Sequence, residues 1–125
     1  MRYLALIYAG EREWDALTHD ERSAIYARYR ALMQDDRIVG GDELAPTTTA
    51  TTVRVRDGET VVTDGPFVET KEALGGYFLI EAESMDEALD LAAQIPGAET
   101  GAVEVRPCYV DEAAGQAHES EEVVA

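Results

Sequence analysis

Residues 77–89 read YFLIEAESMDEAL, a strand pattern that runs directly into the start of a helix. The first seven of these residues are mostly aromatic and aliphatic, which is typical of a buried strand. Ser84 and Glu87 have the spacing of a capping box, in which each side chain accepts a hydrogen bond from an orphan backbone N–H. Proline and glycine at 96–97 end this second segment, whose predicted inward stripe is Met85, Ala88, Leu89, Ala92 and Ile95.

The first third of the chain repeats this order. Residues 3–9 form an apolar run that stops at Gly10 and predicts a central strand. Thr18 and Glu21 form another capping box, and acids in the first turn suit the positive end of the helix dipole. The helix is expected to fade near residues 35–36, with an inward stripe of Ile25, Tyr29 and Leu32 that is widened by Ala24 and Met33.

Paired strands separate the two helices. Residues 53–56 alternate apolar and polar side chains, Asp57-Gly58 is a preferred tight-turn dipeptide, and residues 60–63 return as the second strand of a hairpin. Residues 103–106 predict a final strand that stops at Pro107. This order predicts an α+β fold of the ferredoxin-like split β-α-β type, with an antiparallel sheet and two helices on one face.

The first strand carries apolar residues on both of its faces. Tyr3, Ala5 and Ile7 alternate with Leu4 and Leu6, so both faces of the sheet require burial. The two helices cover one face only. A second copy of the chain is the simplest cover for the other, and we expect a homodimer.

Length and charge limit the classes of function. The chain has 125 residues, which fits one domain, expected over residues 1–110. Its 26 acidic residues outnumber 10 basic ones, and the net charge of −16 disfavours nucleic acid and anionic membranes as partners. Residues 111–125 hold five of these acids and no lysine or arginine, which predicts an acidic, loosely ordered tail. A single cysteine, Cys108, excludes an internal disulfide, and the N-terminal apolar run is too short for a signal peptide, so we expect a cytoplasmic protein.

The densest polar segment is residues 64–77, DGPFVETKEALGGY. It contains Lys71, the only lysine, whose ammonium can be desolvated to act as a base or can contact an anion. The alternative is that Lys71 pairs with Glu69 or Glu72 to hold the loop. Asp64 is a candidate general base, and the alternative for it is a turn-making carboxylate that accepts backbone N–H bonds.

Three aromatic residues complete the candidate ligand site. Tyr8 ends the first strand and Tyr77 begins a later one, so both hydroxyls could point into one cavity, with core packing as the alternative. Trp14 could cover that cavity or cap the core. No Cys/His spacing of a zinc site and no phosphate-binding glycine loop is present, so neither a metal nor a cofactor is expected.

The segment DGPFVETKEALGGY resembles the signature of the DGPF-type branch of the YCII-related proteins. Residues 3–8, Trp14, the second capping box and residues 103–107 extend the resemblance over about residues 1–108. It implies a ferredoxin-like fold that dimerises into an α+β barrel. Enzymes with related folds include oxygenases, isomerases and a dehydrochlorinase acting on hydroxylated aromatics, and some DGPF-type proteins are associated with extracytoplasmic-function sigma factors.

The sequence departs from the His–Asp pair that the resemblance implies for YCII-type enzymes. Its two histidines are His19, at the start of a helix, and His118, in the predicted tail, and neither is placed to pair with Asp64. We therefore expect a small-molecule-binding protein or cofactor-free enzyme acting on a small hydroxylated or carbonyl compound. The alternative is an interaction module for a sigma factor. The predicted catalytic residues are Asp64 and Lys71, and the predicted ligand-binding residues are Tyr8, Trp14, Glu69, Glu72 and Tyr77.

Overall fold

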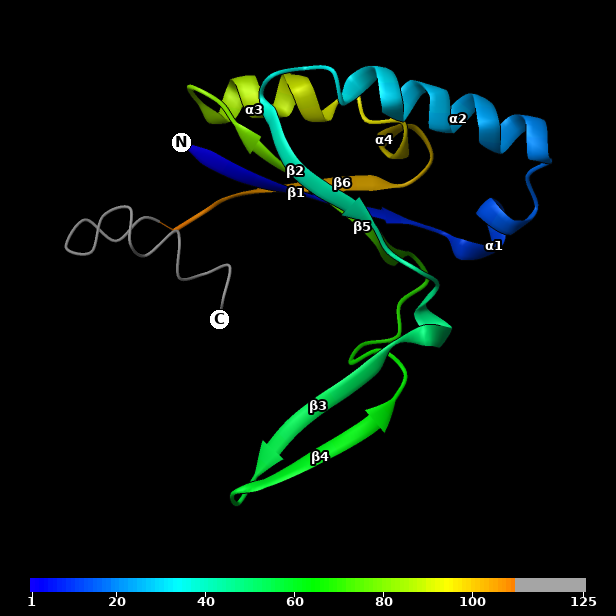
Figure 1. Ribbon diagram of the computed structural model, residues 1–125, viewed down its shortest axis with the longest axis vertical. Helices are drawn as coiled ribbons and strands as arrows, with labels where there is room; N and C mark the ends of the chain where they lie inside the picture. Colours follow the sequence, from blue (N-terminus) through cyan, green and yellow to red (C-terminus); the bar gives the residue numbers. More distant parts are fainter. Residues whose placement is uncertain (110–125) are drawn as a thin grey trace.

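The computed structural model describes residues 1–109. The predicted acidic tail, residues 111–125, lies outside the described residues. The elements follow the order β1 (Arg2–Ala9), α1 (Glu11–Asp15), α2 (His19–Leu32), β2 (Ile38–Glu43), the 3-10 turn η1 (Thr47–Thr49), β3 (Thr51–Arg56), β4 (Glu59–Asp64), β5 (Ala73–Glu81), α3 (Met85–Ala92), α4 (Gly97–Thr100) and β6 (Ala102–Pro107) (Figure 1). No helix within residues 1–109 is long and apolar enough to cross a membrane.

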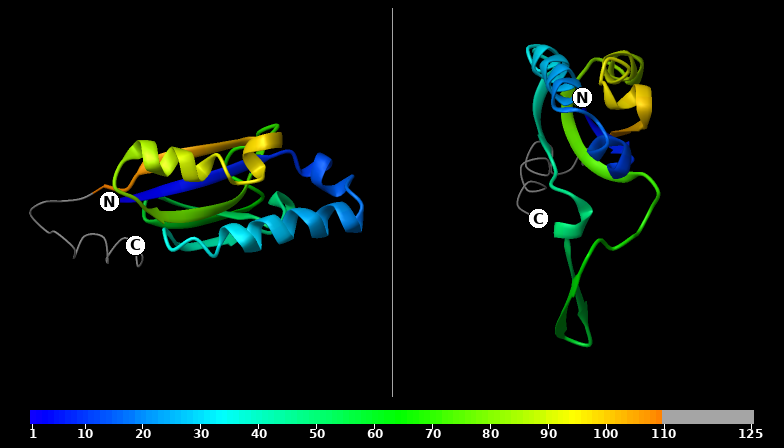
Figure 2. Two further views of the ribbon diagram at one scale, coloured as in Figure 1. Left: turned by 90° about the horizontal axis from the view of Figure 1, so that it is seen from above. Right: turned by 90° about the vertical axis from the view of Figure 1, so that its right-hand side faces the viewer.

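The main sheet has four strands in the order β2-β5-β1-β6, and every neighbouring pair is antiparallel. β1–α2–β2 and β5–α3–β6 are the two split β-α-β halves, so the predicted ferredoxin-like fold is confirmed. Helices α2, α3 and α4 lie together on one side of this sheet (Figure 2). The prediction of an antiparallel sheet with its helices on one face is therefore confirmed as well.

The two helix starts differ in how far the capping boxes form. At α2, Glu21 N–H donates to Thr18 Oγ1 at 3.1 Å and Thr18 N–H donates to Glu21 Oε1 at 2.8 Å, so this box is complete. At α3, Glu87 N–H donates to Ser84 Oγ at 3.2 Å. The Glu87 carboxylate accepts from the N–H of Glu83 instead of Ser84, so the second predicted box is half formed.

The core lies between the helices and one face of the sheet. Tyr3, Ala5 and Ile7 of β1 and Phe78 and Ile80 of β5 supply the sheet side of this core. The helices and the segments after β5 and after α3 contribute the remaining core residues Leu32, Ala82, Ala88, Leu91, Ala92 and Ile95.

Two predicted stripes need correction. Leu91 is fully buried, whereas Leu89 is 47% exposed, because the side of α3 that packs on the sheet presents positions 88, 91 and 92. On α2, Ile25 and Tyr29 are half-buried and Leu32 is buried, as predicted. Ala24 and Met33 are exposed, since they lie beside this stripe and not within it.

An ionic cluster joins the start of β2 to α3. The Arg37 guanidinium donates to Asp35 (Nη2 to Oδ2, 2.7 Å) and to Glu87 in α3 (Nη1 to Oε1, 3.4 Å). The backbone N–H of Arg37 also donates to Asp35 Oδ1 at 2.9 Å. The hydrogen bonds from the Arg37 side chain, then from its backbone, lower the pKa of Asp35 to about 2.

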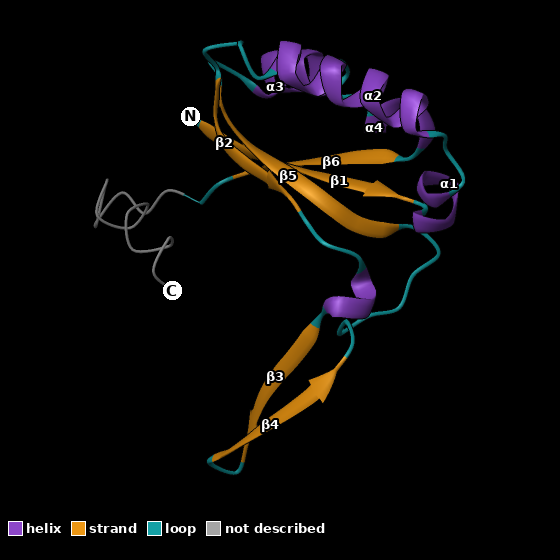
Figure 3. Ribbon diagram, turned by 45° about the vertical axis from the view of Figure 1, so that its right-hand side comes forward, coloured by secondary structure: helices purple, strands orange, loops and turns teal. Residues whose placement is uncertain are grey.

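Strands β3 and β4 form a separate two-stranded sheet, as the sequence predicted for residues 53–63. Its turn holds Asp57 and Gly58 at φ values of 52° and 78°, the left-handed pair that a tight hairpin turn requires. The hairpin projects away from the main sheet, on the side opposite the helices (Figures 1 and 3).

Candidate functional site

The side of the main sheet that faces away from the helices carries the candidate site. We call it the uncovered face. Leu4, Leu6 and Tyr8 of β1 alternate with the buried core residues of that strand and therefore lie on this face. The register places Leu4 opposite Leu79 and Leu6 opposite Tyr77, so β5 contributes two further large side chains to it. The expectation that both faces of β1 carry apolar residues is thus met by the structure.

Tyr8 and Tyr77 lie on this same face, near one end of the sheet. Tyr77 stands between Leu6 of β1 and Asp42 of β2. Tyr8 stands opposite Leu74, because the ladder skips Gly75 where its register shifts. Both rings are half-buried, and neither hydroxyl has a hydrogen bond within residues 1–109. Two phenolic groups beside an apolar surface can donate to, or accept from, a bound hydroxyl or carbonyl oxygen.

The segment 64–72 leads from the hairpin to this end of the sheet. Asp64 is the last residue of β4 and is exposed, with Thr51 as its register partner. Lys71 is exposed and makes no ion pair with any described residue, so the predicted pairing with Glu69 or Glu72 does not form here. β5 begins two residues after Lys71, where Ala73 stands opposite Ala9 and next to Tyr8. Lys71 and the exposed Glu72 therefore lie immediately before the point where β5 begins to pair with the end of β1.

Trp14 lies apart from these residues. Its ring packs edge-on against Tyr26 of α2, with centroids 5.4 Å apart, and the guanidinium carbon of Arg22 lies 6.0 Å from the centre of the Trp14 ring. Since α2 covers the other side of the sheet, the structure does not bring Trp14 together with Tyr77. Of its two predicted roles, covering the cavity or capping the core, these contacts favour the second.

Hydrogen bonds fix the neighbouring segments. Glu11 accepts from Thr47 at both the backbone N–H (2.8 Å) and the hydroxyl (2.6 Å), and the hydroxyl bond followed by the backbone bond lowers the pKa of Glu11. The hydroxyl of Tyr26 donates to Glu43 of β2 at 2.8 Å. Burial, followed by this bond to the carboxylate, raises the pKa of Tyr26. These contacts tie α1 to η1 and α2 to β2.

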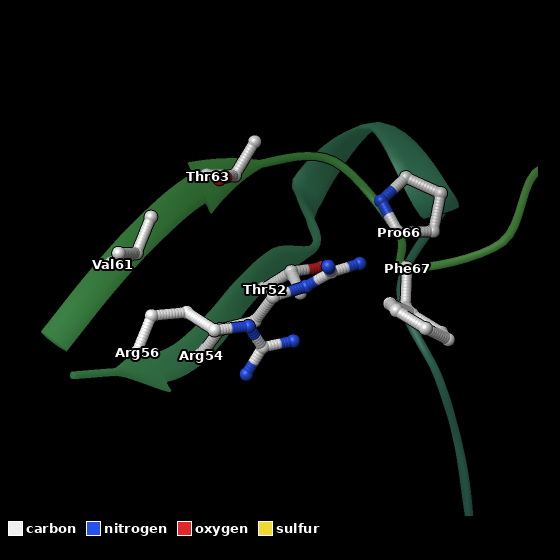
Figure 4. A pocket seen from close by; sticks show the side chains of 7 residues that line it. All are labelled: Thr52, Arg54, Arg56, Val61, Thr63, Pro66 and Phe67. Carbon is white, nitrogen blue, oxygen red and sulfur yellow. The ribbon is translucent and has the colours of Figure 1, made fainter.

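A hollow of about 340 Å³ lies on one face of the hairpin, and no candidate residue predicted from the sequence lines it. Arg54 and Arg56 project into it, and the Arg54 guanidinium lies 4.7 Å from the centre of the Phe67 ring (Figure 4). The sequence did contain a signal for this hollow. Thr52, Arg54 and Arg56 alternate with apolar residues, and every second residue of a strand lies on the same face. The complete lining is Thr52, Arg54, Arg56, Val61, Thr63, Pro66 and Phe67.

Comparison with known proteins gives the family. The model of the YCII-related domain matches residues 1–110. The chain belongs to the YCII-related domain family. An uncharacterised protein of Rhizobium meliloti (strain 1021) is 41% identical to this YCII-related protein over 113 residues, which cover 86% of this chain and 91% of that protein. Among solved structures, a 5-chloro-2-hydroxyhydroquinone dehydrochlorinase from Burkholderia phenoliruptrix AC1100, in complex with 2,5-dihydroxybenzoquinone, is 18% identical, with a TM-score of 0.47 and coverage of 90% of this chain and 98% of that one.

The histidines of this YCII-related protein do not form a His–Asp pair within the described residues. His19 is the exposed first residue of α2, a helix that lies on the side of the sheet opposite the hairpin and Asp64. His118 lies outside the described residues. Within residues 1–109, no three His, Cys, Asp or Glu side chains gather as they would around a metal ion.

Proposed function

We propose that this YCII-related protein binds a small hydroxylated or carbonyl compound on the uncovered face of its sheet. The observation that carries the proposal is the pair of half-buried tyrosines, Tyr8 and Tyr77, whose hydroxyls have no partner among the described residues. A ring or carbon skeleton would pack on Leu6 and its apolar neighbours. The two hydroxyls would bind its oxygen atoms, since a phenol both donates and accepts.

In this proposal a second copy of the chain closes the uncovered face and excludes water from the ligand. An apolar sheet face open to solvent costs free energy that self-association removes. A homodimer with two-fold symmetry would bring two such faces together. The ligand would then lie in an interior where hydrogen bonds from Tyr8 and Tyr77 are stronger than in water.

The segment 64–72 supplies the charged groups of the proposal. Lys71 would contact an anionic oxygen of the ligand or, if the closed dimer desolvates it, act as a base. Asp64, Glu69 and Glu72 are the acids available to that segment as a base or as hydrogen-bond acceptors.

A thermal-shift screen against small phenols, quinones and keto acids tests the proposal. We expect at least one of these compounds to raise the melting temperature of the wild type. Tyr77→Phe and Lys71→Ala should reduce that shift, while Arg30→Ala, which removes an exposed cation from α2, should keep it. A screen without a single stabilising compound, or a shift that persists in both site variants, would contradict a ligand site on this face.

Binding to an extracytoplasmic-function sigma factor is the alternative function. It would use the acidic surface and residues 111–125, and those residues lie outside the described part of the chain. A pull-down of the sigma factor with the full chain, compared with a chain that ends at residue 110, distinguishes this alternative from ligand binding. Capture that weakens with salt and with loss of the tail would favour the alternative.

A further inference from the structure

One face of the β3–β4 hairpin is an exposed apolar surface. Val53 stands opposite Val62, and Val55 lies two residues further along the same face. We call Val53, Val55 and Val62 the valine face. Their exposed fractions are 61%, 60% and 62%, which is high for three β-branched side chains that lie together. A patch of this kind on a projecting element marks a surface that another molecule covers.

The hairpin cannot obtain this cover from its own sheet. It projects away from β2, β5, β1 and β6 (Figures 1 and 3), and a two-stranded hairpin alone in water is marginally stable. Its base is nevertheless anchored. Gly65 N–H donates to Ala50 O at 2.7 Å, and the Thr52 hydroxyl donates to Gly65 O at 2.7 Å. The hairpin is therefore an arm with a closed base and an apolar face that is still exposed.

We propose that the valine face docks on a second copy of this chain, so that each copy of the dimer reaches its partner with this arm. The inference rests on the homodimer described under Proposed function. It adds the arm as a contact surface that the sheet faces alone do not contain. Under two-fold symmetry the contact forms twice, and both valine faces become buried.

The direction of the arm supports a second copy as the occupant. The hairpin leaves the body on the side opposite the helices, which is the side of the uncovered face (Figure 2). A second copy that packs on the uncovered face therefore stands beside the arm.

Charge supports the same occupant. The opposite face of the arm carries Arg54 and Arg56, and neither has an acidic partner within residues 1–109. Only three of the 26 acidic residues of the chain lie in the hairpin, so the body of a second copy is an acidic surface. Two carboxylates of that body lie on the uncovered face: Asp42 stands opposite Tyr77, and Glu104 stands opposite Leu6. Neither makes an ion pair with a residue in 1–109. The acidic body of a second copy therefore attracts the arginines of the arm over a distance, while the valine face makes the direct contact and the arginine face points away from it.

The test compares a double variant of the valine face with a matched control on the other face of the same arm. Val53→Thr/Val62→Thr keeps the β-branched shape and the strand propensity but replaces methyl groups with hydroxyls. Val61→Thr makes the same change on the arginine face, where Val61 stands opposite Arg54. Sedimentation velocity over a dilution series gives the dimer dissociation constant of each. We expect the double variant to raise it by about tenfold or more and the control to leave it within about twofold.

Hydrogen exchange gives a second readout that does not depend on a mutation. Backbone amides of residues 51–64 should be protected in the concentrated wild type and should lose that protection on dilution, at the concentration where the dimer dissociates. Circular dichroism of both variants checks that the fold is retained.

The outcomes separate this inference from the proposed function. A wild type that stays monomeric at every concentration would overturn both. A dimer whose hairpin amides exchange as fast as in the monomer, with an unchanged dissociation constant for the double variant, would overturn the arm alone. Protection that disappears when the chain is ended at residue 109 would assign the cover to the tail, and would also overturn the inference.

Discussion

Asp35→Asn tests the ionic cluster that joins β2 to α3. In the wild type the Asp35 carboxylate accepts from Arg37 at Nη2 (2.7 Å), at Nε (2.9 Å) and at the backbone N–H (2.9 Å). The substitution keeps one acceptor oxygen and removes the charge and the second acceptor. Arg37 then retains only the longer bond to Glu87, at 3.4 Å, as its ionic contact among the described residues.

The pKa of Asp35 sets an upper limit on the loss. A decrease from 3.8 to about 2 corresponds to roughly 2.5 kcal/mol between the charged and neutral forms. The Asp35 and Arg37 side chains are 27% and 35% exposed, so water screens the pair and the net effect is smaller. We expect the free energy of unfolding to fall by about 1 kcal/mol at pH 7.

The effect should depend on pH with a defined sign. The pKa of Asp35 is lower in the folded state than in the unfolded state, so its contribution is present above about pH 4 and is lost as the pH falls towards 2. Urea unfolding at one fixed protein concentration, at pH 7 and at pH 2.5, measures it. The gap between wild type and variant should shrink at the lower pH. Asp36→Asn, at an exposed neighbour without an ion pair within residues 1–109, is the control and should change stability by less than about 0.5 kcal/mol. Equal stabilities of Asp35→Asn and wild type at pH 7, or a gap that does not change with pH, would refute the reasoning.

Three further predictions concern the fold that positions the site. Leu91→Ala should lower the free energy of unfolding by about 3 kcal/mol because Leu91 is fully buried, and Leu89→Ala should cost less than about 1 kcal/mol; equal losses in chemical unfolding would contradict the observed face of α3. Thr18→Ala removes the complete capping box and should lower the free energy of unfolding by about 1 kcal/mol in the same assay. An unchanged unfolding midpoint would contradict a stabilising role for this cap. A Cβ on Gly41 would lie 2.5 Å from a backbone oxygen of β5, so Gly41→Ala should cost at least about 1 kcal/mol, whereas Gly40→Ala, with its nearest contact at 3.6 Å, should be better tolerated.

Part of the candidate site could be predicted from the sequence. The alternation along β1 was enough to group Tyr8 with Leu4 and Leu6 on one face, because a strand has a fixed period of two, but the packing of the helices decided which face carries the core. The face of Tyr77 could not be predicted, because residues 77–80 are all apolar and only the register with β1 places Tyr77 opposite Leu6. The packing of Trp14 could not be predicted, because its partner Tyr26 is twelve residues away on a helix whose placement depends on the whole sheet. The hollow around Arg54 was missed, although the alternation in β3 was visible, because the approach of Phe67 depends on how the chain turns after β4.

The sequence by itself determined the local elements of this protein: the helix start at Thr18, the turn at Asp57-Gly58 and the two-faced first strand. Each depends on interactions between residues a few positions apart, which propensity and spacing encode directly. Tertiary structure alone decided the features that join distant segments. Leu91 is buried and Leu89 is exposed because the way α3 packs on the sheet decides which of its sides faces the core. Arg37 bonds to Glu87 across fifty residues, and the hairpin stands clear of the sheet, because the path of the whole chain sets both positions.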